Sequence, residues 1–169
     1  TELRQRLSEK LGVPPDNILA GSGAVELIRL VALTYFRQDD PVLILEPTFG
    51  EYEVASQIVG AEPIKQWMRA EDNFALRMRE TVNLIKQHRP RAVFVCNPNN
   101  PTGKYLSRQE IEMISDAGRN SLLILDEAYV TFVDESWSAI DLISQDNVVI
   151  LRSMTKDYAL AGLRLGYAV

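Results

Sequence analysis

Segments in which hydrophobic residues recur at helical spacing alternate along the chain with short apolar runs. Residues 1–11 carry a leucine at every fourth position, and Gly12 with the Pro14-Pro15 pair indicates where this first helix ends. A possible SxxE capping box, Ser107 to Glu110, marks the start of another helix. The same spacing predicts five helices in all, over residues 1–11, Ala24–Phe36, Tyr52–Val59, Leu76–His88 and Ser107–Ala117.

The short apolar runs between these helices are typical of β-strands. Seven segments qualify: Ile18–Ala20, Val42–Leu45, Pro63–Trp67, Ala92–Val95, Leu122–Leu125, Asn147–Leu151 and Arg164–Val169. Continuous apolar strands that alternate with helices predict an α/β fold, in which a mainly parallel sheet is covered on both faces. The helix Ala24–Phe36 is apolar on most sides, so we expect it to pack under the sheet. Only about a dozen residues join the last two strands, which leaves the direction of the final strand open.

Composition and charge narrow the class of protein. A length of 169 residues fits one domain, and a hydrophobic content of 46% is typical of a globular chain. The formal charge is −5, with acidic and basic residues mixed along the sequence, which argues against a nucleic-acid partner. There is no signal peptide and no apolar run near 18 residues, so we expect a soluble, cytoplasmic protein without a membrane partner.

Cysteine and histidine are too scarce to support a disulfide framework or a metal site. Cys96 is the single cysteine and suits a reducing compartment. His88 is the single histidine, and it lies in the polar stretch KQHRPR. The expected role of His88 is that of a solvated residue at the end of a helix, so we predict no metal.

Three segments place polar groups where apolar runs end. Lys156 lies in SMTKDY, shortly after the run that ends at Leu151. The segment CNPNNPTG, residues 96–103, follows another run, and its two Asn-Pro steps impose an irregular turn. In LILDEAY, residues 123–129, an apolar run ends in two carboxylates and a phenol. Because ligands bind at the carboxyl edge of open α/β sheets, we predict a site at this edge.

The chemistry of these side chains suggests how they would hold a flat heterocycle. Asp126, desolvated at a strand end, would stay ionised only beside a cation or strong donor, and it suits a protonated ring nitrogen. Asn100 and Tyr129 could hold a ring hydroxyl, and Phe49 could stack on the ring. Ordinary structural roles are the alternatives: a helix or turn cap for Asp126, a turn former for Asn100 and a core or lid aromatic for Phe49.

A second group of residues suits an anion. Ser22, Ser153, Thr155 and Arg164 could converge with backbone N–H groups at the start of the helix that begins at Ala24, where the helix dipole favours negative charge.

An amine nucleophile, an acid for a pyridinium, a donor for a phenolate oxygen, a stacking ring and a phosphate cradle together describe a pyridoxal phosphate site. In this chemistry Lys156 forms a Schiff base with the cofactor aldehyde, and a substrate amine then displaces it. The freed lysine moves the α-proton, while Asp126 keeps the ring nitrogen protonated so that the ring accepts electrons.

With NPNNPTG, DEAY, SMTK and GLRLGY in that order, the sequence resembles the fold-type I aminotransferases of class I/II, and most of all the histidinol-phosphate aminotransferase branch. The likeness covers essentially the whole chain. It implies Lys156 as the Schiff-base lysine, Asp126 at the pyridine nitrogen, Asn100 and Tyr129 at the ring oxygen, Phe49 on the ring, and Ser153, Thr155, Arg164 and the backbone of Ala24 and Val25 at the phosphate. It also implies a three-layer αβα sandwich whose seven-stranded sheet is mostly parallel, with Arg164–Val169 as an antiparallel last strand.

The resemblance further implies a homodimer that uses pyridoxal 5'-phosphate, an amino acid or amino-phosphate substrate and a 2-oxo acid. Family members are much longer, so we expect residues 1–169 to be the large, cofactor-binding domain without the N-terminal arm and the C-terminal small domain, weakly active or inactive alone. Many relatives carry an acidic or hydroxyl residue where this chain has Ala24 or Val25, so phosphate contacts there would come from the backbone.

Three alternatives stay open. Threonine-phosphate decarboxylases of cobalamin synthesis share this scaffold, and Thr155 and Tyr158 around the lysine look like theirs, whereas ALAGLRLGYA looks more like the aminotransferases. A Rossmann-type nucleotide-binding module is suggested by GSG before a helix, but its GxGxxG pattern requires glycine where Glu26 stands. A non-catalytic scaffold would be favoured by replacement of Lys156 or Asp126, and both are present.

Overall fold

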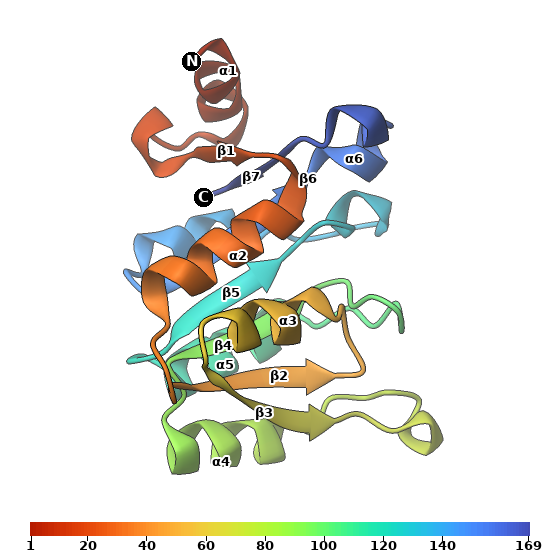
Figure 1. Cartoon of the computed structure of the whole chain (residues 1–169). Helices are drawn as coiled ribbons and strands as arrows, with labels where there is room; N and C mark the ends of the chain where they lie inside the picture. Colours follow the sequence, from red (N-terminus) through yellow and green to blue (C-terminus); the bar gives the residue numbers. More distant parts are fainter.

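A computed structural model describes residues 1–169 and shows three layers, with a seven-stranded sheet between two layers of helices (Figure 1). Its strands are β1 (Leu19–Gly21), β2 (Pro41–Glu46), β3 (Glu62–Trp67), β4 (Ala92–Cys96), β5 (Leu122–Asp126), β6 (Val148–Ser153) and β7 (Gly166–Ala168). All seven predicted strands are present, so the short apolar runs located every element of the sheet.

The order of strands across the sheet is β1-β7-β6-β5-β4-β2-β3. Strands β2 to β6 pair in parallel, whereas β7 runs antiparallel to both of its neighbours, β1 and β6. The pattern alone left the direction of this strand open, and the antiparallel direction implied by the family resemblance is confirmed. Ala168 lies opposite Leu19 on one side and Leu151 on the other, which joins the two ends of the chain.

The helices are α1 (Glu2–Leu11), α2 (Gly23–Tyr35), α3 (Glu51–Ile58), α4 (Met78–His88), α5 (Arg108–Ala117) and the short α6 (Met154–Asp157). The five predicted helices are confirmed. The capping box is present too, because Ser107 Oγ accepts from the backbone N–H of Glu110 while the Glu110 carboxylate accepts from the backbone N–H of Ser107. Helix α6 and five 3₁₀ turns, η1 (Pro15–Asn17), η2 (Ala70–Asp72), η3 (Val130–Phe132), η4 (Ile140–Ser144) and η5 (Ala161–Leu163), are too short to show a period in the sequence.

Alternate residues of each central strand supply two separate cores. On one face, Ile44 and Phe94 pack with Leu27 of α2 and Tyr52 of α3. The opposite face is covered by α4, α5 and η4, whose apolar residues pack on the remaining strand positions, among them Val95. Because both faces are buried, the strands read as continuous apolar runs and not as alternating ones.

Helix α2 buries only one side against the sheet. Leu27, Ile28 and Val31 are buried, whereas Leu30 and Leu33 are 39% and 59% exposed. The expectation that this strongly apolar helix packs under the sheet is therefore correct for one face of the helix. The apolar residues on its other face lie at the surface.

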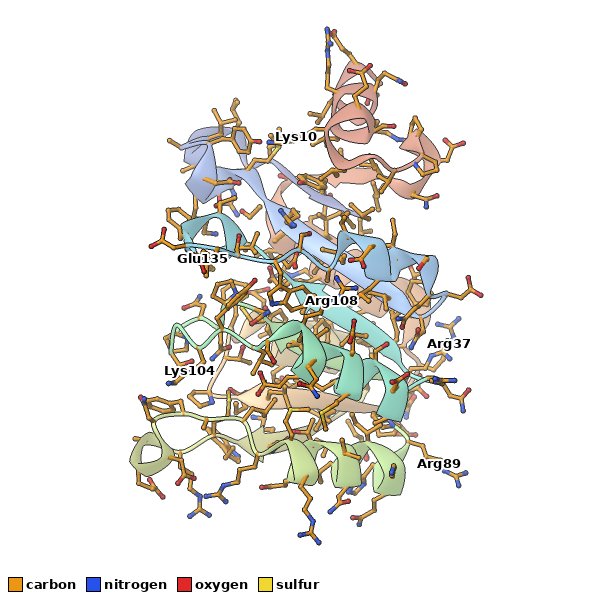
Figure 2. All side chains as sticks on the ribbon, turned by 180° about the vertical axis from the view of Figure 1, so that it is seen from behind. Lys10, Arg37, Arg89, Lys104, Arg108 and Glu135 are labelled. Carbon is orange, nitrogen blue, oxygen red and sulfur yellow. The ribbon has the colours of Figure 1, made fainter.

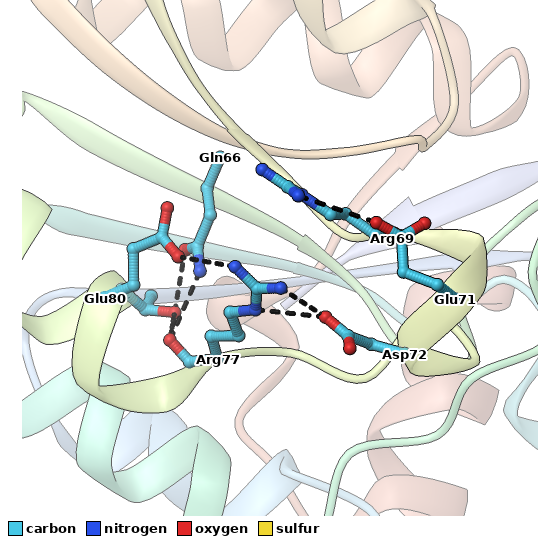
Figure 3. Close-up of polar contacts among 7 residues, drawn as sticks. Gln66, Arg69, Glu71, Asp72, Arg77 and Glu80 are labelled. Carbon is cyan, nitrogen blue, oxygen red and sulfur yellow. Dashed lines mark hydrogen bonds and ion pairs between the residues drawn. The ribbon is translucent and has the colours of Figure 1, made fainter.

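Polar contacts fix the connection from β3 to α4, outside the predicted site (Figure 3). The side chain of Gln66 accepts from Thr81 Oγ1 at 2.8 Å and donates to the carbonyl of Arg77 at 3.2 Å. The guanidinium of Arg77 also forms an ion pair with Asp72, drawn in Figure 3, and both side chains are exposed. The hydrogen bonds of the buried Gln66 hold the loop in this conformation, because exposed ion pairs contribute little to stability.

Figure 2 shows charged side chains on separate elements, among them Lys10, Arg37, Arg89, Lys104, Arg108 and Glu135. None of the helices is both long and apolar enough to cross a membrane. His88 is the exposed last residue of α4, as expected.

Candidate active site

An open cavity lies beyond the carboxyl ends of β2, β4, β5 and β6 and the amino end of α2, at the edge where open α/β sheets bind ligands. Its wall contains ten of the eleven candidates named from the sequence: Ala24, Val25, Phe49, Asn100, Asp126, Tyr129, Ser153, Thr155, Lys156 and Arg164. Cys96 and Ala128 complete the lining. Ser22 does not line this cavity, although it was a candidate for the anion site, and it lies in an adjacent surface groove.

Parallel register brings these residues together. Asp126 ends β5 and lies opposite Cys96 at the end of β4 and Leu151 of β6. The three strands therefore stop at the same edge of the sheet, and the loops that leave them carry Asn100, Tyr129 and Lys156 to a common space. Residues far apart in the sequence converge because parallel strands end in the same direction.

Asp126 has a fully enclosed carboxylate. The residue is 2% exposed, its Oδ1 accepts from the backbone N–H of Ala128 at 3.0 Å, and its Oδ2 accepts from the hydroxyl of Tyr52 at 2.8 Å. Burial raises the pKa of this carboxyl, while the two donors and the positive charge of Lys156 oppose that rise. The site therefore holds a desolvated acid that a cation in the cavity would stabilise.

Lys156 lies on α6 and lines the same cavity as this acid. Its Nζ lies 5.2 Å from the ring centroid of Tyr129, and its side chain is exposed to solvent. Ser153 caps the start of this helix, because its side chain accepts from the backbone N–H of Thr155. The hydroxyls of Ser153 and Thr155 are buried and 2.8 Å apart. An amine is thus accessible from the cavity, next to a pair of hydroxyls.

Two glycines allow Arg164 and the start of α2 to meet. Gly23 has φ +80°, and a Cβ built there would lie 3.2 Å from Nη2 of Arg164. A Cβ at Gly166 of β7 would lie 2.9 Å from the backbone of Gly23 and 3.0 Å from the N of Ala24. The guanidinium therefore packs directly against a helix N-terminus, and both attract an anion.

In the loop of residues 96–103, two asparagines hold the backbone and a third lines the cavity. Asn99 accepts from the hydroxyl of Thr48 and donates to the carbonyl of Pro47 and to Thr102. Asn97 exchanges hydrogen bonds with the backbone of Leu106. With both neighbours committed to holding the loop, Asn100 is the asparagine that faces the cavity.

Sequence reasoning missed three residues of this site. Cys96 follows a predicted strand directly, and its burial raises the pKa of the thiol to about 12, so it stays protonated and is no nucleophile at neutral pH. Ala128 contributes its N–H to Asp126 from within the DEAY motif. Tyr52 was predicted only as part of a helix, and the one signal that could have found it is its position three residues after Phe49.

The three-layer α/β fold therefore carries, at the carboxyl edge of its sheet, a cavity whose wall holds an amine, an enclosed acid and the junction of an arginine with a helix N-terminus. The model of the family "Aminotransferase class I and II" matches residues 1–169. The chain belongs to this family.

Individual relatives agree with the family match. The histidinol-phosphate aminotransferase of Thermoanaerobacter pseudethanolicus is 37% identical over 169 residues, which are 99% of this chain and 47% of that protein. Among solved structures, the histidinol-phosphate aminotransferase of Clostridium acetobutylicum superposes with a TM-score of 0.86 at 26% identity, covering 98% of this chain and 48% of the other. The L-threonine-O-3-phosphate decarboxylase of Porphyromonas gingivalis superposes with a TM-score of 0.83 at 29% identity, over 99% and 51%. The chain thus spans about half the length of the curated relatives it matches.

Proposed function

We propose that this chain binds pyridoxal 5'-phosphate in the cavity and is the cofactor-binding domain of an aminotransferase. One observation carries the proposal: Lys156, the enclosed Asp126 and the junction of Arg164 with α2 all line a single cavity. The donor set fits the cofactor, because each polar part of it has a chemical counterpart in the wall. The carboxylate suits a pyridinium nitrogen, and the cationic cradle suits a phosphate.

Each wall residue has a distinct proposed contact. Lys156 would bind the aldehyde carbon, and Asp126 would hold the protonated ring nitrogen. Phe49 would stack on the ring, and Asn100 and Tyr129 would contact the ring oxygen.

The phosphate would lie at the other end of the cavity. The backbone N–H groups of Ala24 and Val25, the hydroxyls of Ser153 and Thr155, and Arg164 would bind it. The backbone suffices at Ala24 and Val25 because a helix N-terminus presents unpaired N–H groups.

When bound, the cofactor supplies a ring that accepts the electrons of a bond broken at the substrate α-carbon. The chain's own residues manage the protons. Asp126, fixed by two donors, holds a proton on the ring nitrogen, and Nζ of Lys156 takes the proton from the α-carbon and returns it. Lys156 can take and return this proton because its amine, on α6, is exposed to the cavity.

We propose amino-group transfer between a histidinol-phosphate-like amino substrate and a 2-oxo acid. The names of the Thermoanaerobacter and Clostridium proteins support this choice. Decarboxylation of a threonine-phosphate-like substrate is the second candidate, supported by the Porphyromonas structure. Glutamate formed from 2-oxoglutarate, or carbon dioxide released from the amino substrate, would distinguish the two reactions.

We further propose that residues 1–169 form the large domain of a longer, homodimeric cytoplasmic enzyme. Support comes from the length of the relatives, of which the chain spans 47% in the Thermoanaerobacter protein. On this proposal, the groups that bind the substrate carboxylate lie elsewhere in the enzyme, since Arg164 is the one arginine in the cavity wall and is assigned to the phosphate.

The first test is an absorption titration of the purified chain with pyridoxal phosphate. We expect the parent chain to give the visible band of the lysine-bound cofactor, and borohydride to remove it. Lys156→Ala should lose the band, whereas Lys86→Ala, which removes an exposed lysine on α4, should keep it. A band that persists in Lys156→Ala would contradict the assignment of the amine.

A further inference from the structure

Tyr52 is a completely buried phenol directly behind the candidate site. It lies in the first turn of α3, has no exposed surface, and does not line the cavity. Its hydroxyl donates to Oδ2 of Asp126 at 2.8 Å, across 74 residues of sequence. Tyr52 can therefore influence a ligand only through the residues that it contacts.

The ring of Tyr52 contacts a second wall residue. Its centroid is 4.8 Å from that of Phe94 on β4, nearly parallel at 14°, and 5.8 Å from that of Phe49, almost perpendicular at 84°. The stack on Phe94 ties the ring to the sheet. One side chain thus joins Asp126 and Phe49, the two residues assigned to the ring nitrogen and the ring face.

The phenol is suited to act as a permanent donor. Burial, followed by the nearby charge of Asp126, raises the pKa of Tyr52 well above its ordinary value, so the hydroxyl keeps its proton over the working pH range. The other oxygen of Asp126 is held by the backbone N–H of Ala128. Each carboxylate oxygen therefore has one fixed donor, and Tyr52 is the one that mutation can remove.

We propose that Tyr52 is a positioning residue for the cofactor ring: its hydroxyl orients the Asp126 carboxylate toward the ring nitrogen, and its ring supports Phe49 from behind. The inference rests on the proposed pyridoxal phosphate site and adds a residue to it. The proton shared by carboxylate and ring nitrogen should lie on the nitrogen while Tyr52 donates, because a hydrogen bond to the ionised acid lowers its basicity.

Tyr52→Phe removes the hydroxyl and keeps the stacked ring. We expect the dissociation constant for pyridoxal phosphate to rise roughly tenfold, the effect of losing one hydrogen bond to a charged group. With cofactor labelled at the pyridine nitrogen, the ¹⁵N chemical shift should move toward that of unprotonated pyridine. In the chain without cofactor, a ¹³C-carboxyl titration should show a higher pKa for Asp126 than in the parent.

Tyr105→Phe is the matched control. The partly buried Tyr105 hydroxyl donates to the carbonyl of Trp137 and accepts from its backbone N–H, but it lies outside the cavity wall. This variant should leave the cofactor affinity, the ¹⁵N shift and the pKa of Asp126 as in the parent. Circular dichroism verifies that both variants are folded.

The outcomes separate this inference from the proposed function. A parent chain that binds cofactor through Lys156, with the affinity, shift and pKa unchanged in Tyr52→Phe, overturns the role of Tyr52 alone. Equal effects in Tyr52→Phe and Tyr105→Phe would mean that a general loss of stability explains them, and this result would also overturn the role of Tyr52. A parent chain that binds no cofactor overturns both proposals.

Discussion

Asp126 and Glu127 are adjacent carboxylates with different surroundings. Burial raises the pKa of both. The Glu127 side chain is 1% exposed, but Arg152 lies 2.6 Å away and the N–H of Ala139 donates to it, so its charge is paired within the chain. Asp126 has neutral donors and only Lys156 as a nearby cation. Glu127 therefore serves the structure, and Asp126 is left for a ligand.

This difference predicts how stability depends on pH in Asp126→Asn. The parent carboxyl has a folded-state pKa above its ordinary value of 3.8, so the folded chain loses stability as pH rises through that raised value. Asparagine can accept from Ala128 and donate to the Tyr52 oxygen. At neutral pH, we expect the free energy of unfolding of the variant to exceed that of the parent by on the order of 1 kcal/mol. Below the ordinary pKa of the carboxyl, the two free energies should be equal.

Denaturant unfolding of both chains without cofactor, from acid to neutral pH, measures this effect. If the free energies of unfolding of the two chains changed in the same way with pH, the prediction would be contradicted. The same substitution should abolish cofactor binding, so the residue would be retained for function at the expense of stability.

At the scale of residues, the side chains proposed to contact the cofactor could be predicted from the sequence, whereas the residue that holds one of them in place could not. Lys156, Asp126 and Asn100 stand in short polar segments after apolar runs, so their place at the sheet edge could be inferred. Tyr52 stands in an amphipathic helix where an aromatic is ordinary. Its link to Asp126 depends on the packing of α3 against β4, which no local pattern encodes.

At the scale of elements, the site depends on how closely β7 approaches α2. The backbone atoms around Gly166 leave no room for a side chain, because a Cβ would meet Arg152 O and Gly23 C at 2.9 Å. Backbone cannot swing aside as a long side chain does. The separation of the two elements is therefore set by a glycine, and with it the position of Arg164 against the helix N-terminus.

We predict that Gly166→Ala pushes α2 away from β7. The free energy of unfolding should fall by roughly 1–3 kcal/mol, and the affinity for the phosphate of the cofactor should fall with it. Gly162→Ala is the matched control, since no atom lies within 4 Å of a Cβ at that position and its φ is not positive. Denaturant unfolding and the absorption titration measure both effects, and equal behaviour of the two variants would contradict the prediction.

Strands and long helices were predictable, whereas short helices were not. Buried parallel strands such as β4 and β5 are uninterrupted apolar runs, so their position is plain in the sequence. Helix α6 has four residues and no room for a period. It forms because Ser153 caps it at the end of β6, which is a consequence of the sheet.

At the scale of the whole molecule, the sheet has a stable centre and a less protected end. Strands β4 and β5 pair on both sides and are covered by helices, whereas β1 pairs with β7 alone and each of these two has three residues. We expect amide hydrogens of β1 and β7 to exchange together, well before those of β4 and β5. Native-state hydrogen exchange measures this order, and equal protection of all four strands would contradict it.

Family and fold followed from the sequence, but the reaction did not. The groups in the cavity wall that we propose for the cofactor would serve transfer and decarboxylation alike. The choice depends on which bond at the α-carbon stands perpendicular to the ring, and groups that orient the substrate carboxylate decide it. Arg164 is the one arginine in the wall, and its place beside Gly23 suits the phosphate.

The pairing of Leu19 with Ala168 has a consequence for biosynthesis. A ribosome adds roughly 5–20 residues per second, so β1 waits about 7–30 s for its only partner. During that time the parallel strands β2 to β5 can already assemble, while the apolar side of α1 and β1 stays uncovered. This apolar surface should therefore stay exposed until β7 has been synthesised, and the cavity, which needs β7 to place Arg164, closes last.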